Sequence, residues 1–313
     1  MSSTGPQVER ARKVPLAKRA RRELRVRALV ALLPLLARLP HRVTVALGAL
    51  AGRLAWAAAR RHRRAALEHL AIAFPERDEA WRARVARASF VNLGRSAGEL
   101  LAVERVDLGR AVQFEPGALE TLRAAHAEGR GVVAISCHLG NWELLARTVA
   151  AAGLPLATVA REAQDPRLTK LLERARASTG IASLWRNDPG SAREFIRHLR
   201  KGDVVAALID QDTDVSGHFV PFFGREAFTP RAPSDLALRL GAAVVFARTS
   251  RVAPGMHRIR VSRLEVPASG DREADSRALT AAATAAIEEE VRQHPDQWVW
   301  MHARWRTRRG SIR

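Results

Sequence analysis

The feature that most constrains the fold is a regular alternation, downstream of Gly117, between short apolar runs and longer stretches of helical periodicity. Strands that alternate with helices form βαβ units, in which the strands of one sheet run parallel. We therefore predict an α/β fold with a mostly parallel sheet flanked by helices. Strands are predicted at 132–136, 156–160, 204–210 and 243–249 with an edge strand at 257–266, and helices at 141–152, 166–179, 189–200, 233–240 and 275–294.

The N-terminal part differs in composition from the rest, so we divide the chain into three regions. Residues 1–23 are polar, basic and predicted to be disordered, whereas residues 24–61 contain the charge-free apolar runs 28–37 and 43–52. Neither run reaches the ~18 apolar residues of a spanning helix, so we expect a retained helical membrane anchor that lies on or partly in the membrane. A buried helical hairpin is the alternative. Residues 62–313 are predicted to form the α/β domain.

The formal net charge of +20 is concentrated at the two ends of the chain. Residues 1–64 hold 16 Lys and Arg against two acids, residues 298–313 hold five Arg and no acid, and the part between is close to neutral. This distribution suits an anionic membrane surface or an acidic protein partner. No zinc-finger spacing or aromatic block accompanies the charge, so we expect no nucleic-acid partner. The single cysteine excludes an internal disulfide framework.

Polar residues follow three of the predicted strands, at the sheet edge where α/β proteins bind ligands. The run GVVAISCHLGNWEL delivers His138, PLATVARE delivers Arg161, and VVAALIDQDTD delivers Asp210, Gln211 and Asp212. A base, carboxylates and a fixed cation at one edge indicate a catalytic cleft. Two carboxylates without further ligands are thin support for a metal, and we predict neither a metal nor a cofactor.

His138 is the predicted general base, with Glu143 five residues on as its orienting carboxylate. The two side chains can meet only if His138 lies in a loop, with Asn141 capping the helix that follows. Amides at the start of that helix could stabilise an oxyanion. Chance alone yields about one such spacing in this chain, and His198 with Asp203 provides another, which we interpret as structural. Cys137 is the rival nucleophile, but it should face away from His138.

Beyond the bare spacing, the segment SCHLGNWELLA resembles the late acyltransferases of lipid A biosynthesis, within the lysophospholipid acyltransferase superfamily. The likeness continues in RHRRAALEHLAIAFPE, SFVNLGRSAGELL, PFFGREAFTPRAPSDLALRLGAAVVF and HPDQWVWMHARWRTR, and covers about residues 40–308. The resemblance implies a glycerolipid-acyltransferase-like fold, His138 and Glu143 as the catalytic pair, and substrate contacts nearby. The residues implied in substrate binding are Asn141, Trp142, Arg161, Asp210, Gln211, Asp212, Phe223, Gly224, Thr229, Arg231 and Arg304.

The same resemblance implies a bacterial enzyme on the cytoplasmic face of the inner membrane, using acyl carrier protein or coenzyme A thioesters as donor. The expected acceptor is a hydroxyl of a lipid A precursor or related glycolipid, with no acyl-enzyme. A lysophospholipid or mannosylated phosphatidylinositol acceptor is the alternative, and a basic peripheral membrane-binding module is the non-enzymatic one. Arg161 and Arg231 could bind substrate or form ion pairs within the protein. Trp298, Trp300 and Trp305, near the C-terminus, could pack against the sheet or contact the membrane.

Overall fold

A seven-stranded sheet forms the centre of the computed structural model, which describes residues 23, 27, 30–163, 165–186 and 188–310. The strand order is β1-β9-β8-β2-β5-β3-β4, and every neighbouring pair is parallel except β8 with β9. The α/β prediction is thus confirmed. The strands are β1 (Val112–Phe114), β2 (Val132–Ser136), β3 (Leu156–Ala160), β4 (Ala182–Trp185), β5 (Val204–Leu208), β8 (Ala243–Ala253) and β9 (Met256–Leu264).

The central strands β2 and β5 position the candidate site. Every residue of β2 is buried, because helices cover both faces of the sheet, and four of its five side chains are apolar. The register pairs Val132 with Val204 and Ser136 with Leu208, so both strands end at the same edge. The polar residues that follow them, from His138 and from Asp210 onward, must therefore emerge side by side.

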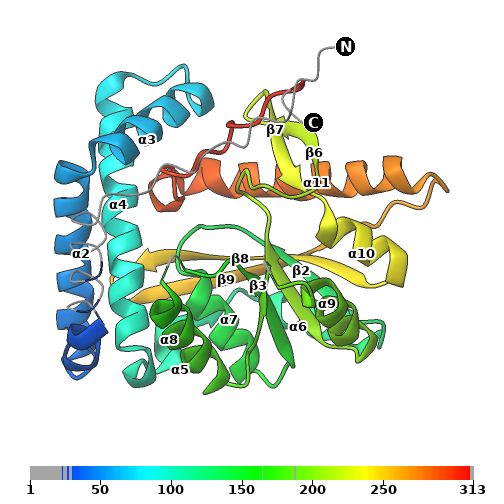
Figure 1. The fold of residues 1–313 in the computed structure, drawn as a ribbon, viewed down its shortest axis with the longest axis horizontal. Coiled ribbons are helices and arrows are strands. Elements are labelled where there is room, and N and C mark those ends of the chain that lie inside the picture. Colours follow the sequence, from blue (N-terminus) through cyan, green and yellow to red (C-terminus); the bar gives the residue numbers. More distant parts are fainter. Residues whose placement is uncertain (1–22, 24–26, 28–29, 164, 187, 311–313) are drawn as a thin grey trace, which may run out of the picture.

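Helices form a layer on each face of this sheet (Figure 1). On one face, α6 and α7 pack through Leu122 and Leu145 against a core that includes Ala134. On the other face, α9, α10 and α11 pack against a core that includes Ile135 and Phe246. The bounds are α6 (Ala118–Ala127), α7 (Trp142–Ala151), α8 (Pro166–Ala177), α9 (Ser191–Arg200), α10 (Ala232–Leu240) and α11 (Arg272–Gln293).

Long α2 and α4 stand beside the strand ends, in close mutual contact (Figure 1). Glycines make this approach possible, because a Cβ on Gly48 would overlap the Gly94 carbonyl and a Cβ on Gly98 would overlap the Thr44 carbonyl. Gly52 faces the Phe90 carbonyl in the same way. The N-terminal helices are α2 (His41–Ala58), α3 (Arg60–Ala73) and α4 (Glu79–Leu101), and the short α5 (Leu108–Ala111) follows η1 (Val103–Arg105).

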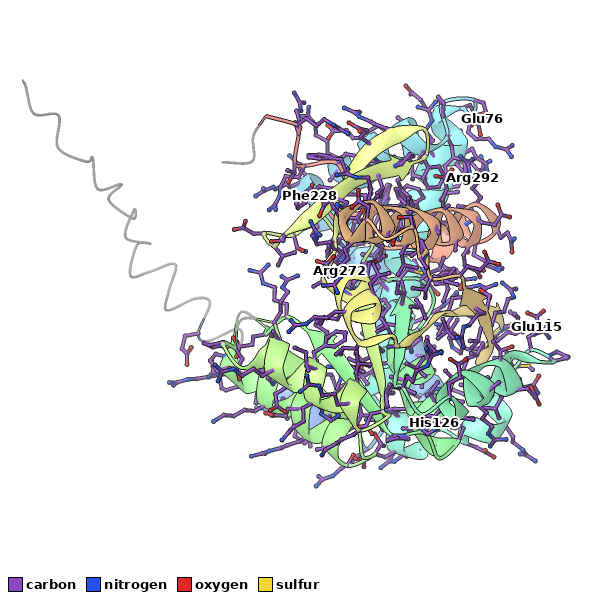
Figure 2. The ribbon with its side chains drawn as sticks, turned by 90° about the vertical axis from the view of Figure 1, so that its right-hand side faces the viewer. Glu76, Glu115, His126, Phe228, Arg272 and Arg292 are labelled. Atoms are coloured by element: carbon purple, nitrogen blue, oxygen red, sulfur yellow. The ribbon has the colours of Figure 1, made fainter. Side chains whose placement is uncertain are left out.

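A two-stranded hairpin of β6 (Gly217–Phe222) and β7 (Arg225–Pro230) stands above the main sheet, beside α11. Figure 2 shows Phe228 in this hairpin and Arg292 on α11. The C-terminal segment after η2 (Pro295–Gln297) runs between the hairpin and the sheet edge, and buries Trp298 and Trp300 almost completely. Of the two alternatives left open for these tryptophans, packing and membrane contact, the structure thus supports packing.

The five predicted main strands and five predicted helices are confirmed, each within four residues at either end. The sequence analysis missed β1, β4 and the β6–β7 hairpin. The structure does not support the expected N-terminal membrane anchor. None of the described helices is long and apolar enough to cross a bilayer. The predicted disordered arm, 1–23, lies outside the described residues except for Glu23.

Candidate active site

A tight turn after β2 presents His138 at the sheet edge. The backbone of this turn is held by the C-terminal segment, since Val299 N donates to the His138 carbonyl and Gly140 N donates to the Gln297 carbonyl, each over 3.2 Å. Gly140 has a φ of 62°, and a Cβ there would overlap the Thr249 carbonyl. Only glycine fits both requirements, so residue 140 fixes the direction in which the chain enters α7.

The carboxylate that orients His138 belongs to Asp210, directly after β5. Asp210 Oδ1 lies 2.7 Å from His138 Nδ1, and Oδ2 accepts from the His138 backbone N–H at 2.7 Å. Trp298 Nε1 also donates to Oδ2, over 2.7 Å. Burial alone raises the pKa of the Asp210 carboxyl, but the His138 ring and these three hydrogen bonds outweigh it and lower the pKa to about 2. Asp210 is therefore ionised at neutral pH.

This contact determines which nitrogen of the imidazole can act as a base. A carboxylate only accepts hydrogen bonds, so His138 Nδ1 must carry a hydrogen and Nε2 holds the free electron pair of the neutral ring. Gln211 Nε2 lies 3.0 Å from this Nε2 atom, which fits an amide that donates to it. The rings of Trp142 and His302 lie 4.9 and 5.5 Å from the imidazole, centroid to centroid.

Glu143 has a different partner from the one predicted. Its carboxylate receives two hydrogen bonds from the Arg176 guanidinium, over 2.5 and 3.1 Å, and both side chains are at most 10% exposed. Both ring nitrogens of His138 are meanwhile engaged by Asp210 and Gln211. The predicted His138–Glu143 hydrogen bond is thus replaced by two contacts. The reason is that β5 lies beside β2 and brings Asp210 under the imidazole, while α7 carries Glu143 toward α8.

A cavity of ≈ 550 Å³ opens beside His138, within the size range of ligand pockets. Trp142, Glu143, Arg161 and Gln211 join His138 in its wall. Most of the remaining wall is aliphatic and comes from β3, β5, α7, α9 and α10. A largely apolar cavity with a potential base in its wall can hold a hydrocarbon chain whose reactive end meets His138.

The two competing residues of the sequence analysis lie elsewhere. Cys137 is buried in the core on the α9–α11 face, and desolvation with the nearby Asp210 charge raises the pKa of its thiol. A buried, protonated thiol is a poor nucleophile. His198 lies at the end of α9, where its Nδ1 contacts Asp203 over 2.7 Å. This pair repeats the His138–Asp210 contact, but neither residue lines the cavity.

Several residues predicted to contact substrate are instead engaged within the protein. Arg304 is fully buried, donates to the Phe228 carbonyl and to Thr229 Oγ1, and has its pKa lowered by burial to about 10. Asp212 accepts from the Thr307 backbone and hydroxyl. Because Arg304, Thr229 and Asp212 carry almost no accessible surface, we assign them to holding the C-terminal segment in place.

Other predicted residues also have structural partners. Arg231 is paired with Asp235 and Glu273. Asn141 caps α7 by accepting from Leu144 N, and its amide donates to Glu99. Phe223 and Gly224 form the turn of the β6–β7 hairpin, both with positive φ. The structure thus brings together His138, Trp142, Glu143, Arg161, Asp210 and Gln211, whereas the remaining predicted residues have their contacts within the protein and do not line the cavity.

The sequence analysis missed three functional candidates: Arg176, Trp298 and His302. Arg176 lies in the basic run ERARAS, where nothing distinguishes it from its neighbours. Trp298 and His302 lie in HPDQWVWMHARWRTR, one of the segments that resemble the acyltransferase family. That resemblance was the feature of the sequence from which a role near the site could have been inferred for both. Burial together with the nearby His138 lowers the pKa of His302 to about 4, so its ring is neutral at pH 7.

Comparison with known proteins identifies the chain's family. The family model of the bacterial lipid A biosynthesis acyltransferases matches residues 16–307. The chain belongs to this family. It is an acyltransferase. The lipid A biosynthesis palmitoleoyltransferase of Escherichia coli K12 is 27% identical over 86% of this chain and 87% of its own length. The lauroyltransferase of the same organism is 26% identical over 89% of this chain and 90% of its own length.

A third relative acts on another lipid. The phosphatidylinositol mannoside acyltransferase of Mycobacterium tuberculosis H37Rv is 25% identical over 70% of this chain and 69% of its own length. Family membership therefore establishes acyl transfer, but it does not determine which lipid accepts the acyl group.

Proposed function

We propose that this acyltransferase moves a fatty acyl group from a carrier thioester onto a hydroxyl of a lipid A precursor or related glycolipid, with His138 as general base. The observation that carries the proposal is the His138–Asp210 pair, whose imidazole forms part of the wall of a largely apolar cavity. The names of the two E. coli relatives support lipid A as the acceptor class, and the mycobacterial relative supports a mannosylated phosphatidylinositol as the second candidate.

The proposed reaction proceeds without an acyl-enzyme. The acceptor hydroxyl displaces Gln211 from His138 Nε2, gives its proton to that nitrogen, and attacks the thioester carbon as it does so. The carbonyl becomes a tetrahedral oxyanion, which first-turn amides of α7 would stabilise. Collapse of this intermediate breaks the carbon–sulfur bond, and the departing thiolate recovers the proton from His138. The products are an ester and a free carrier thiol.

Asp210 and Glu143 have separate tasks in this scheme. Asp210 holds the productive tautomer and offsets the positive charge that His138 gains during the reaction. Glu143 stays within the catalytic site as a wall residue whose pairing with Arg176 fixes the start of α7 against α8. Arg161 is exposed at the cavity and offers a cation to a phosphate of either substrate.

The donor and the location are parts of the same proposal. We propose an acyl carrier protein as donor, because the basic ends of the chain would attract an acidic partner. Attachment to an anionic membrane surface, on the cytoplasmic face of the inner membrane, would place the enzyme beside its lipid acceptor. The exposed Leu47, Leu50 and Leu54 of α2 support contact with the bilayer surface.

The test is an acyl-transfer assay of His138→Ala with Cys137→Ala and His198→Ala as controls. Loss of the base should lower turnover by a factor on the order of 10²–10⁴ with the fold intact, while both controls remain active. Intact-protein mass spectrometry after addition of donor alone should show no acyl adduct. An acylated Cys137, or an active His138→Ala beside an inactive His198→Ala, would overturn the mechanism. Mass spectrometry of the acylated lipid distinguishes the two acceptor classes.

A further inference from the structure

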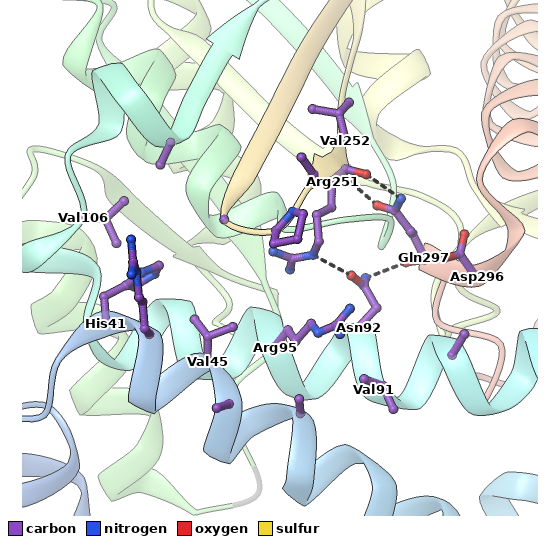
Figure 3. Close-up of a pocket in the computed structure, with 18 of the residues that line it drawn as sticks. His41, Val45, Val91, Asn92, Arg95, Val106, Arg251, Val252, Asp296 and Gln297 are labelled. Atoms are coloured by element: carbon purple, nitrogen blue, oxygen red, sulfur yellow. Dashed lines mark hydrogen bonds between the residues drawn. The ribbon is translucent and has the colours of Figure 1, made fainter.

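A second hollow, separate from the cavity beside His138, lies between α2, α4 and the tip of the β8–β9 hairpin (Figure 3). Its volume is ≈ 1360 Å³, and its wall shares none of the described residues that line the His138 cavity. We call this hollow the arginine cleft, because eight arginines line it against two carboxylates. The arginines are Arg42, Arg53, Arg84, Arg87, Arg95, Arg105, Arg110 and Arg251, and the carboxylates are Asp107 and Asp296.

Three of these arginines already have partners. Arg251 is compensated by the buried Glu99, Arg110 by Asp107, and Arg105 binds the Arg38 and Leu39 carbonyls. Within the part of the chain that the structure describes, no carboxylate pairs with the other five, Arg42, Arg53, Arg84, Arg87 and Arg95. Arginines elsewhere on the surface, such as Arg231, Arg263 and Arg309, do have acidic partners. The cleft therefore holds unneutralised charge.

An exposed apolar stripe runs along α2 next to the arginine cleft. Val43, Leu47, Leu50 and Leu54 follow helical spacing and are 41%, 41%, 48% and 61% exposed. At ~100° per residue the stripe lies roughly a quarter turn around α2 from Arg42 and Arg53, and away from the glycine face that packs on α4. The surface thus places an apolar stripe beside a cationic cleft, and an anionic lipid carries the matching hydrocarbon chains and phosphate.

We propose that the arginine cleft binds the phosphate of an anionic membrane-lipid head group, with the apolar stripe of α2 resting in the acyl region beside it. Guanidinium groups suit this ligand, because their planar donors pair with two phosphate oxygens at once. Nucleic acid also carries phosphate, but it offers nothing that would cover a stripe of leucines. An acidic protein is the remaining competitor, and the experiment below separates it.

A chain of hydrogen bonds connects the arginine cleft to the turn that carries His138. Asn92 and Gln297 form part of the cleft wall and are linked to Arg251 by hydrogen bonds that Figure 3 draws. The Gln297 carbonyl in turn accepts from Gly140 N, two residues after His138. This inference rests on the membrane attachment included in the proposed function and assigns it to one site, but vesicle binding tests it independently of acyl transfer.

The test measures vesicle binding of the full-length protein with three cleft arginines removed. Arg53→Gln/Arg87→Gln/Arg95→Gln is compared with a charge-matched control, Arg193→Gln/Arg200→Gln/Arg272→Gln, whose residues are exposed on α9 and at the start of α11 (Arg272 in Figure 2). On phosphatidylcholine vesicles containing phosphatidic acid, the cleft variant should lose at least about tenfold in affinity and the control less than about twofold. Equal losses would show diffuse charge only and overturn the proposal.

Soluble ligands identify the source of the bound phosphate. Calorimetry of the detergent-solubilised protein should show that dihexanoyl phosphatidic acid binds more tightly than inorganic phosphate, and that the cleft variant loses this binding. Equal affinity for inorganic phosphate would mark a simple anion site and remove the lipid from the proposal. Tight binding of polyglutamate without binding to anionic vesicles would assign the cleft to an acidic protein. Thermal melting of both triple variants should match the wild type.

Discussion

In the proposed mechanism, His138 depends on Asp210 to act as a base. Replacing it by Asn retains the size of the side chain but presents an amide that can donate to Nδ1, which favours the wrong imidazole tautomer. We expect Asp210→Asn to lower turnover by a factor on the order of 10²–10⁴. The matched control is Asp203→Asn, which alters the same contact at His198 and should leave turnover unchanged. Comparable losses in both variants would remove Asp210 from the mechanism.

Glu143 and Arg176 form a buried ion pair whose loss should appear first in stability. Glu143→Gln leaves the Arg176 guanidinium buried without its counter-charge, which typically costs about 3–5 kcal/mol. The double variant Glu143→Gln/Arg176→Gln removes both charges and should recover part of that loss. Denaturant unfolding of the three proteins measures it. If Glu143→Gln abolishes turnover while unfolding normally, Glu143 takes part in the chemistry directly.

His302 should make the fold sensitive to mild acid. Burial holds the pKa of His302 at about 4, whereas the ordinary value is 6.5. Between these values the unfolded chain takes up a proton that the folded chain does not, so stability falls as pH decreases through this window. His302→Gln should therefore show a shallower decline in the free energy of unfolding between about pH 7 and pH 4. Identical slopes in the two proteins would contradict the assignment.

At the scale of elements, the contact between α2 and α4 depends on glycine. In most exposed helix positions Gly→Ala stabilises by about 1 kcal/mol, through helix propensity. Gly48→Ala should have the opposite sign, because the new methyl group meets the Gly94 carbonyl and forces the helices apart. A lower melting temperature for Gly48→Ala than for Ala51→Leu, an exposed site on the same helix, is the expected result. Equal melting temperatures would mean that the two helices are free to separate.

Elements with strong periodicity could be predicted from the sequence, and those defined by distant partners could not. The runs at β2, β3 and β5 are long enough to indicate buried strands by themselves. The three-residue β1 exists because it pairs with β9, and β4 because it pairs with β3. The same limit applied at the site. The sequence placed His138 at the sheet edge, but its contact with Asp210 spans 72 residues and depends on β2 and β5 being neighbours. The sequence analysis placed Asp210 at the same sheet edge, but it paired His138 with Glu143, the acid nearer in the chain.

At the scale of the whole molecule, the distribution of charge predicts how the donor arrives. The excess of 52 basic over 32 acidic side chains lies mainly at the ends of the chain. Electrostatic steering of an acidic carrier protein should raise kcat/KM at low ionic strength. At physiological salt, where the Debye length is ~8–10 Å, attraction over longer distances is screened and this gain in kcat/KM should disappear. The coenzyme A thioester, a small donor, should show a weaker salt dependence. Equal salt profiles for the two donors would exclude carrier steering.

The segment that follows α11 closes the reaction site around residues made much earlier. Trp298 binds Asp210, Val299 binds the turn at His138, and Thr307 binds Asp212. A ribosome that has released only the sheet and its helices has therefore produced His138 with Asp210 beside it, but without the contacts from Trp298 and Val299. Translation must pass Thr307, and that stretch must leave the exit tunnel, before the full set of contacts can form. Under the proposed mechanism, we therefore expect acyl transfer only after nearly the entire described chain has been synthesised.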